Sequence, residues 1–299
     1  MQSIVSYPDR GTYGNNRYRG NCSGRLIEDI IDQYHLDSLS DFMVGGGTTE
    51  DVVKAKNLKG TFADLNRGFD MLSMEIPERP KNIFWHPPYH DMVVYSDNMY
   101  KASEIKDRFG FDPKECDLSR CKNWDEFVKL LNHCMLKQYC ALEKGGRIFT
   151  LMGDLKRNGR LYSMLCDIAK PGTLEQIVIK AQHNCWSDSV QYSNRNFVPI
   201  VHEYLLVLKK EQDLLVPVQY GTRTMLDVRK MNAASWRDAV HDVISDAGHA
   251  LHLDELYEAL KDSPKVKTNN FWREKIRQTV QNAKYFTRTA VGTYALAAA

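Results

Sequence analysis

The sequence has no long apolar run: none of its 299 residues belongs to a stretch near the roughly 18 consecutive apolar residues that a membrane-spanning helix needs. The segment Met1–Ile4 lacks the charged-then-apolar pattern of a secretory signal. The seven cysteines are scattered and contain no CxxC pair. We therefore expect a cytoplasmic protein with reduced thiols, without a membrane contact, a disulfide framework or a bound metal.

The chain also has little net charge, +2 at pH 7, so its composition does not by itself indicate a nucleic-acid partner. The charge is unevenly distributed, however. Residues 263–299 hold seven Lys or Arg and a single acid, Glu274, and four arginines face one aspartate within residues 1–25. Basic ends on a neutral chain favour a polyanion as partner, and an ordinary solvated face is the alternative.

Apolar periodicity predicts alternating helices and strands over the first two thirds of the chain, and such alternation is typical of a parallel, twisted α/β sheet. Ser23 stands where the N-cap of the first helix is expected. The expected helices cover residues 24–34, 49–57 and 127–142, and the expected strands cover 39–44, 59–63, 82–85, 147–152, 175–181 and 203–209.

The pattern weakens over residues 212–234, which we interpret as a linker or arm after a first domain at 1–211. Residues 235–299 then read as a separate domain. Its expected helices cover 235–247, 253–260 and 270–281, and short strands at 285–289 and 293–296 form a hairpin. Three helices and a hairpin are the order of a winged helix-turn-helix, whose third helix would meet DNA.

A glycine-rich loop follows the first expected strand, in "DFMVGGGTTEDV" at 41–52. Glycines allow close backbone approach to a ligand, and the helix after Gly45–Gly47 offers free N–H groups. Roughly twenty residues on, the next strand ends at Asp64, where an acid suits the hydroxyls of a ribose. The alternative is a tight strand-to-helix turn without a ligand.

The motif His86-Pro87-Pro88-Tyr89 follows the expected strand at 82–85. Neither proline can donate a ladder hydrogen bond, so the strand ends there in a rigid loop. The loop shares the carboxyl edge of the sheet with Gly45–Gly47 and Asp64, and that edge is where open α/β sheets bind ligands. A plain Pro-Pro turn with a packing aromatic is the alternative.

Together, the glycine loop, the acid and the xPPY loop resemble the amino-group DNA methyltransferases, which use S-adenosyl-L-methionine to methylate adenine N6 or cytosine N4. The resemblance covers about residues 10–210 and includes "NRYRGNCSGRLIEDII", "LEKGGRIFTLMGDL" and "VHEYLLVLKK". It implies a Rossmann-like methyltransferase sheet joined to the winged helix-turn-helix. The cofactor residues that it implies are Asn21, Cys22, Ser23, Val44, Gly45, Gly46, Gly47, Thr48, Thr49, Asp64 and Leu65, with Asp41 displaced from the usual acidic position.

The implied activity is methylation of an exocyclic amino group in duplex DNA, with adenine N6 favoured over cytosine N4 and with the base flipped into the HPPY pocket, as in restriction–modification enzymes. The implied catalytic residues are His86, Pro87, Pro88 and Tyr89. The expected DNA-binding residues are Arg273, Lys275, Arg277, Lys284 and Arg288. Trp186 and Tyr192 offer further rings that can stack on bases.

Position 86 departs from the family, which has Asp, Asn or Ser there. A neutral imidazole nitrogen can accept a hydrogen bond from the amine, whereas an imidazolium cannot. His90 follows the motif and is expected to be a local hydrogen-bonding partner, because the two prolines prevent the helix that a His86–His90 metal pair would need. We expect His183 and His202 to be loop residues that pack near the site.

Two other readings stay open. One is a non-catalytic DNA-binding or regulatory protein on a degenerate methyltransferase fold, and the other is a methyltransferase acting on RNA or a small molecule. The sequence carries no signal for an oligomeric state.

Overall fold

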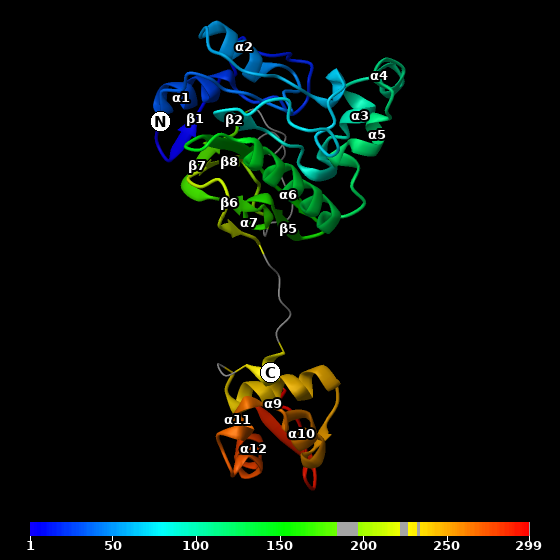
Figure 1. Ribbon diagram of the computed structural model, residues 1–299. Helices are drawn as coiled ribbons and strands as arrows, with labels where there is room; N and C mark the ends of the chain where they lie inside the picture. The colour runs from blue at the N-terminus through cyan, green and yellow to red at the C-terminus, as the bar shows by residue number, and fades with distance from the viewer. Residues whose placement is uncertain (184–196, 222–226, 232–233, 299) are drawn as a thin grey trace. The chain divides into compact units, whose positions relative to one another are not determined.

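The computed structural model describes residues 1–183, 197–221, 227–231 and 234–298, so the rings of Trp186 and Tyr192 lie outside the described chain. The chain divides into two compact units, Met1–Thr222 and Arg223–Ala299 (Figure 1). No helix in the described ranges is long and apolar enough to cross a membrane.

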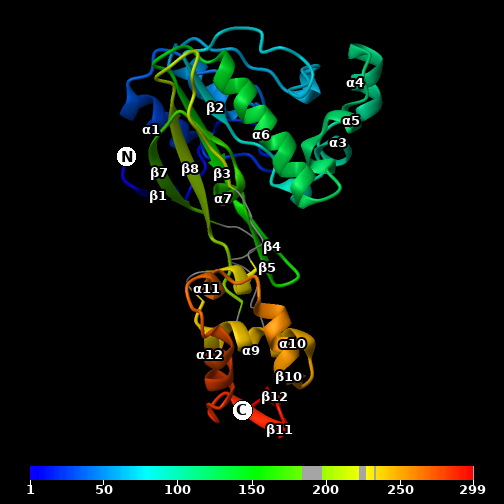
Figure 2. The ribbon, with the colours of Figure 1, turned by 60° about the horizontal axis from the view of Figure 1, so that its bottom comes forward.

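Unit 1 is a mixed α/β unit built on a five-stranded sheet (Figure 2). In spatial order the strands are β1 (Ile4–Ser6), β7 (Thr173–Ala181), β8 (His202–Lys209), β3 (Arg147–Met152) and β2 (Asn82–Trp85). β1 is parallel to β7 and β2 is parallel to β3, whereas β8 is antiparallel to both of its neighbours. The expectation of a wholly parallel sheet is therefore wrong for β8. Because β7 and β8 are adjacent in the sheet and antiparallel, they do not need the long crossover that joins parallel strands.

Two expected strands, 39–44 and 59–63, are shorter than the sequence indicates. They make only isolated parallel bridges, Ser38 with Lys59, Ser40 with Ile83 and Asp41 with Phe62. The first segment stops because the Asp41 carboxylate accepts a hydrogen bond from the Met43 backbone N–H at 3.0 Å, which turns the chain. These bridges place 38–41 between β2 and 59–62. The chain thus continues from this segment to 59–62 on one side and then to β2 on the other side. Such a reversal in strand order opens a crevice at the carboxyl ends of the strands.

Apolar clusters cover both faces of the sheet, since alternate residues of each strand point to opposite sides. Ile83 and Trp85 of β2 pack in one cluster with helix α6 (Trp124–Ala141). Phe84 packs in the other cluster with α1 (Gly24–Tyr34) and α2 (Thr48–Ala55). Figure 2 shows α1 and α6 on either side of the strands. Burial on both faces explains why β2 is apolar without alternation.

Helix ends differ from the expectations: α2 ends at Ala55 and not at residue 57, and α6 begins at Trp124, before the expected start at residue 127. Ser23 is the N-cap residue of α1, but its side chain makes no capping bond and donates instead to the Arg10 carbonyl at 3.4 Å. The shorter elements of unit 1 are η1 (Leu65–Arg67), η2 (His90–Met92), α3 (Tyr95–Asn98), α4 (Ala102–Phe109), α5 (Pro113–Cys116), η3 (Leu118–Arg120), β4 (Asp154–Arg157), β5 (Arg160–Ser163), α7 (Met164–Asp167), β6 (Lys170–Pro171) and β9 (Val218–Gln219). β9 lies within the expected linker 212–234, yet it pairs with β6 of unit 1.

Unit 2 contains the three expected helices and the hairpin, with further short elements. In chain order these are η4 (Val228–Lys230), α9 (Trp236–Ala247), β10 (Leu251–His252), α10 (Leu253–Leu260), α11 (Pro264–Lys267), α12 (Trp272–Val280), β11 (Phe286–Ala290) and β12 (Thr293–Leu296). Ser235 caps α9 in a capping box with Asp238. The strands form a small antiparallel sheet in the order β10-β12-β11. Buried Val240, Leu256 and Ile276 join the three helices in one core. The assignment of this unit to the winged helix-turn-helix class stays a prediction.

Candidate functional site

The glycine loop at 45–47 is a place of close backbone approach. A Cβ on Gly46 would lie 2.7 Å from Asn21 Nδ2, and a Cβ on Gly45, which has a φ of +50°, would lie 2.9 Å from the Tyr18 ring. The Asn15 backbone N–H donates to the Gly46 carbonyl at 2.8 Å. The loop therefore needs glycine because residues 15–21 lie directly over it.

Side chains join the loop to the segment before α1. Thr48 Oγ1 donates to Asn21 Oδ1 at 2.7 Å, and Asn21 Nδ2 donates to the Asn15 carbonyl at 2.9 Å. Thr49 Oγ1 donates to Asp41 Oδ2 at 2.7 Å. Residues expected to hold a cofactor, although distant in sequence, thus lie in one hydrogen-bonded cluster.

A cavity of about 100 Å³, the first cavity, lies at this cluster. Among the expected cofactor residues, Asn21, Cys22, Val44, Gly45, Gly46, Thr48, Thr49, Asp64 and Leu65 line it. The two others do not: Gly47 caps α2, and Ser23 lines a second cavity. The sequence motifs therefore converge on one hollow at the carboxyl ends of the strands.

Two buried acids line the first cavity. Asp64 Oδ2 accepts from the Gly45 backbone N–H at 2.8 Å and Oδ1 accepts from Asn66 N at 3.0 Å, so this carboxylate organises the loop. Burial raises the pKa of Asp64. Burial also raises the pKa of Asp41 to about 7, although the hydrogen bonds from Thr49 and Met43 oppose the shift. Sequence reasoning set Asp41 aside as displaced, whereas the fold places it in the cavity wall. A cation bound there would relieve the cost of ionising both acids.

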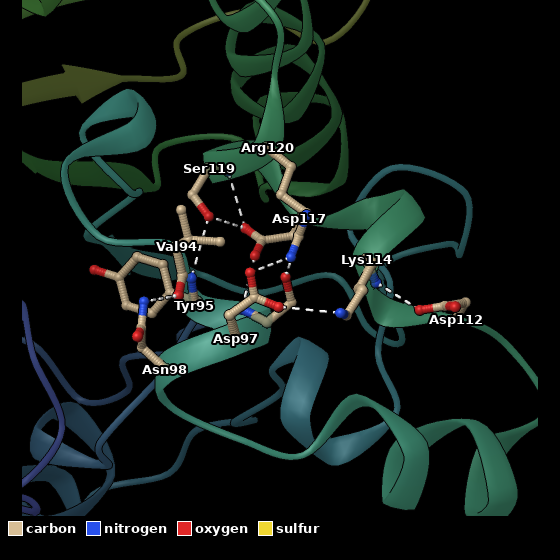
Figure 3. A network of polar contacts seen from close by, with 10 residues as sticks. Val94, Tyr95, Asp97, Asn98, Asp112, Lys114, Asp117, Ser119 and Arg120 are labelled. Atoms are coloured by element: carbon tan, nitrogen blue, oxygen red, sulfur yellow. Dashed lines mark hydrogen bonds and ion pairs between the residues drawn. The ribbon is translucent and has the colours of Figure 1, made fainter.

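A further part of the wall comes from residues 95–118, which the sequence motifs do not assign to the cofactor site. Asp117 holds this wall in place: its Oδ2 accepts from Ser96 N at 2.8 Å and its Oδ1 accepts from Ser119 N at 2.9 Å (Figure 3). Arg120 Nε donates to Ser96 Oγ at 2.7 Å, and its guanidinium also pairs with Asp97. The network joins α3 to η3, so both ends of the chain segment between these two helices are held in position.

Tyr100 contributes an unpartnered polar group to the first cavity. Its hydroxyl oxygen is buried and has no hydrogen-bond partner in the part of the chain that the structure describes. Burial raises the Tyr100 pKa, so the hydroxyl keeps its proton. A buried hydroxyl left unpaired is costly, and a bound ligand could supply the missing partner.

The second cavity, of about 610 Å³, lies on the other side of the HPPY loop. Pro88 lines the first cavity, whereas Pro87 and Tyr89 line the second. His86 lines both cavities, as do Gly20, Asn21 and Tyr95. Two molecules bound in the two cavities would therefore meet at these four shared residues.

His86 belongs to a buried polar network. Its Nε2 lies 2.9 Å from the Tyr89 hydroxyl, which donates to Glu203 Oε1 at 2.6 Å. Lys180 Nζ donates to the second oxygen of Glu203 at 2.6 Å, and the two side chains are only 10% and 8% exposed. Lys180 and Glu203 are direct cross-strand partners on β7 and β8. The ring of Tyr89 lies against Gly153, where a Cβ would approach it to 2.7 Å. Tyr89, which was expected to offer a stacking face, is thus held in place at both its ring and its hydroxyl.

The electrostatics of this network favour a neutral His86 and an ionised Glu203. Burial lowers the pKa of His86, and Lys180 lowers it further against the opposing effect of Glu203. Burial alone would raise the pKa of Glu203, but Lys180, His86 and the hydrogen bond from Tyr89 bring it below the usual value. Burial and Glu203 raise the pKa of Tyr89 well above 10, so it stays protonated.

Three further histidines of unit 1 have hydrogen-bond partners. His90 Nε2 lies 3.1 Å from the Cys121 carbonyl, His183 Nε2 lies 2.8 Å from Ser6 Oγ, and His202 Nε2 lies 2.8 Å from the Tyr204 hydroxyl. The expected local partner of His90 is Asp91, whose Oδ1 lies 3.1 Å from His90 Nδ1. His183 lines the second cavity, whereas His202 begins β8 and is not the loop residue that the sequence indicated. The described residues contain no group of three side chains suited to hold a metal ion.

The residues expected to bind DNA belong to unit 2 and are all exposed. The guanidinium of Arg273 lies 5.2 Å from the ring centre of Trp272, and Arg277 Nε donates to the Tyr257 hydroxyl at 2.8 Å. Arg273, Lys275 and Arg277 lie on α12, Lys284 lies between α12 and β11, and Arg288 lies on β11. These contacts orient the two arginines but leave their charges open to a polyanion.

Neither a family model nor a curated protein matches the sequence. Among solved structures, the chain is similar to TehB from Haemophilus influenzae, with 9% identity, a TM-score of 0.27 and coverage of 62% of each chain. It is similar to the glycopeptide N-methyltransferase MtfA complexed with S-adenosyl-L-methionine, with 9% identity, a TM-score of 0.25 and coverage of 72% of this chain and 79% of that one. It is also similar to an S-adenosylmethionine-dependent methyltransferase from Clostridium acetobutylicum, with 10% identity, a TM-score of 0.24 and coverage of 62% and 90%. The chain thus spans about 62% of TehB. Similarities this weak transfer neither an activity nor a substrate.

Proposed function

We propose that unit 1 binds S-adenosyl-L-methionine in the first cavity and methylates an exocyclic amino group of a DNA base held in the second. Adenine N6 is favoured over cytosine N4. The observation that carries this proposal is the position of His86 in the wall of both cavities. A donor and an acceptor bound on either side would come together at the wall that His86 forms with Gly20, Asn21 and Tyr95, and such positioning accounts for much of the rate of a group transfer.

The polar groups of the first cavity suit this cofactor, although the cavity, at about 100 Å³, must widen to admit it. The buried acids Asp41 and Asp64 favour its sulfonium and amino charges and its ribose hydroxyls, and the glycine loop permits close approach. The unpartnered Tyr100 hydroxyl offers a further hydrogen bond to a polar ligand. When bound, the cofactor supplies an electrophilic methyl group, so the protein needs no metal.

The protein's own part is to bind, orient and dehydrate the amine. A neutral His86 can accept a hydrogen bond from the amino group, and its lowered pKa keeps it neutral at physiological pH. The first proline of the motif, Pro87, lines the same cavity and offers a backbone carbonyl as second acceptor. Two acceptors on one amino group would draw its lone pair out of conjugation with the ring and toward the methyl donor.

Several cationic groups favour a nucleic acid as the substrate. Arg10 and Arg19 line the second cavity, whereas the charge of Lys180, which also lines it, is already paired with Glu203. The two guanidinium groups in the cavity wall suit a phosphate oxygen. In unit 2, the basic α12 and hairpin would add phosphate contacts if this unit is a winged helix-turn-helix.

A small-molecule amine is a second candidate substrate, because a cavity of about 610 Å³ falls within the usual range of small-ligand sites. The fixed Tyr89 ring and the basic lining favour the nucleic acid. A non-catalytic DNA-binding protein that uses the cofactor cavity only for regulation is the alternative without chemistry.

The test is transfer of a labelled methyl group from S-adenosyl-L-methionine by the full-length protein to duplex DNA, RNA or a panel of small amines. Label on adenine or cytosine of DNA, lost in the His86→Ala variant, is the expected result. Label on RNA or on a small amine alone would overturn the DNA proposal. Calorimetric binding of cofactor and DNA without transfer to any acceptor would support the non-catalytic reading instead.

A further inference from the structure

The hydrogen bonds around Glu203 allow a count of protons. An ionised carboxylate can only accept, and the two oxygens of Glu203 accept from the Lys180 ammonium and from the Tyr89 hydroxyl. The position of Glu203 opposite Lys180 on neighbouring central strands makes this arrangement rigid. Both side chains are almost fully buried, so water does not compete for these bonds.

Tyr89 has one hydroxyl proton, and the contact with Glu203 uses it at 2.6 Å. The other contact of the same oxygen, 2.9 Å from His86 Nε2, must therefore be one in which Tyr89 accepts. His86 Nε2 then carries a hydrogen. In a neutral imidazole the second nitrogen, Nδ1, is left with a lone pair, and the hydrogen bond that the His86 ring makes with the described residues is the one at Nε2.

We propose that Tyr89, Glu203 and Lys180 are positioning residues that hold His86 with its proton on Nε2 and present Nδ1 as the acceptor for the substrate amine. The catalytic consequence rests on the proposed function, whereas the tautomer itself does not. The opposite tautomer would turn an N–H toward the amine and would oppose the reaction. Lys180 keeps Glu203 ionised, Glu203 orients the Tyr89 hydroxyl, and Tyr89 sets the tautomer.

The charged groups facing His86 come from several elements. Glu203 lies on β8 and Lys180 on β7, and Tyr89 follows β2 in the same loop as His86. Arg10, Arg19 and His183 line the second cavity beside it. The two buried charges have opposite effects on the His86 pKa, since Glu203 raises it and Lys180 lowers it.

A direct test reads the tautomer in the full-length protein labelled with 15N-histidine. Long-range 1H–15N correlation spectra distinguish an imidazole protonated on Nε2 from one protonated on Nδ1, and the His86→Gln variant identifies the His86 signals. Above pH 7.5 we expect the Nε2–H form. The Nδ1–H form in the unmodified protein would overturn the proposal, whether or not the protein methylates anything.

Variants then test what sets the tautomer. Glu203→Gln and Tyr89→Phe should each yield a tautomer mixture, and Lys180→Arg should keep the Nε2–H form because it retains the charge. The matched control is Glu175→Gln, which removes a carboxylate from β7, the neighbour of β8, where it pairs with Arg147 at 2.6 Å outside both cavities. Unchanged spectra in Glu203→Gln and Tyr89→Phe, or an equal change in the control, would contradict the proposal.

Kinetics provide the functional readout where methyl transfer is present. In Glu203→Gln we expect kcat to fall at least tenfold at an unchanged KM for the cofactor. The acidic limb of the pH–rate profile should move to lower pH, because Glu203 raises the His86 pKa. A merely structural role would lower the active fraction without moving that limb, and a limb at its original pH would count against the proposal.

Discussion

Tyr89 and Glu203 are separated by 114 residues in the sequence, yet the Tyr89 hydroxyl lies 2.6 Å from Glu203 Oε1. This bond ties the rigid loop after β2 to the antiparallel strand β8. Among the described residues, Glu203 carries the only carboxylate within reach of His86, and it lies on the sheet and not in the motif itself. The properties of the HPPY motif therefore depend on a strand that follows it much later.

The first prediction concerns pH. Burial lowers the His86 pKa from its ordinary value of 6.5, so the side chain stays neutral into mildly acidic solution. Protonation removes the acceptor, so activity should be steady above pH 6.5 and should fall only as the pH drops through the lowered pKa. The kcat/KM for methyl transfer between pH 4.5 and 8.5 measures this. A profile without an acidic limb would exclude His86 as the acceptor.

The second prediction concerns the identity of residue 86. Asparagine keeps an acceptor oxygen and does not titrate in this range, so His86→Asn should retain activity and lose the acidic limb. Alanine offers no acceptor, so His86→Ala should lower kcat by about 100-fold or more. Both variants should bind cofactor as the unmodified protein does, which calorimetry checks. Equal activity of the alanine variant would contradict the assigned role.

The third prediction concerns the glycine loop. In Gly46→Ala the new Cβ would lie 2.7 Å from Asn21 Nδ2 and 3.0 Å from Tyr18 Cβ, so residues 18–21 must move away from the loop. We expect cofactor affinity to fall by roughly tenfold, the effect of losing about 1.4 kcal/mol. Gly159→Ala, in the turn between β4 and β5 and outside the lining of both cavities, is the control: nothing lies within 4 Å of its added Cβ, and its φ of +74° strains the alanine without touching the loop. Calorimetric titration of both variants decides, and equal affinities would place the cofactor elsewhere.

The fourth prediction concerns Asp41, whose pKa is about 7 in the folded protein and 3.8 ordinarily. Between these values the native state holds a proton that the unfolded chain has lost, so the Asp41 contribution to the free energy of unfolding decreases as pH rises. The full change is roughly 4 kcal/mol at about 1.4 kcal/mol per pH unit. Asp41→Asn should lack this component. Chemical denaturation of both proteins from pH 4 to 8 tests it, and parallel curves would contradict it.

The fifth prediction concerns the basic face of unit 2. If Lys275 and Arg288 contact phosphates, changing both to Gln should weaken duplex binding and reduce the slope of log K against log salt by about 0.9 per lost contact. Lys261→Gln is the control, because Lys261 already pairs with Glu258 on the same helix turn. Fluorescence anisotropy at several salt concentrations measures the slopes. Slopes that match the control would remove this face from the DNA interface.

Much of the arrangement is readable in the sequence because it is local. Apolar periodicity locates α1, α2 and α6, the longer helices of unit 2, and the sheet strands β2, β3, β7 and β8 within a few residues, and glycines or prolines mark where these strands end. It misses β1 and the helices between residues 95 and 116. The carboxyl-edge rule then brings Gly45–Gly47, Asp64 and His86 to one side of the sheet. The same local reasoning overestimates the segment before the glycine loop, since the turn made by Asp41 and Met43 interrupts it.

The tertiary structure decided what surrounds these motifs. Neither the place of Asp41 in the cavity wall nor the wall held by Asp117 follows from spacing, because both depend on contacts between separate elements. Above all, the antiparallel pairing of β8 with β7 sets Glu203 opposite Lys180 and beneath Tyr89. The sequence by itself determined that a histidine stands at the strand end. Which of its nitrogens carries the proton is decided by long-range hydrogen bonds, since a tautomer is selected by the partners that burial imposes.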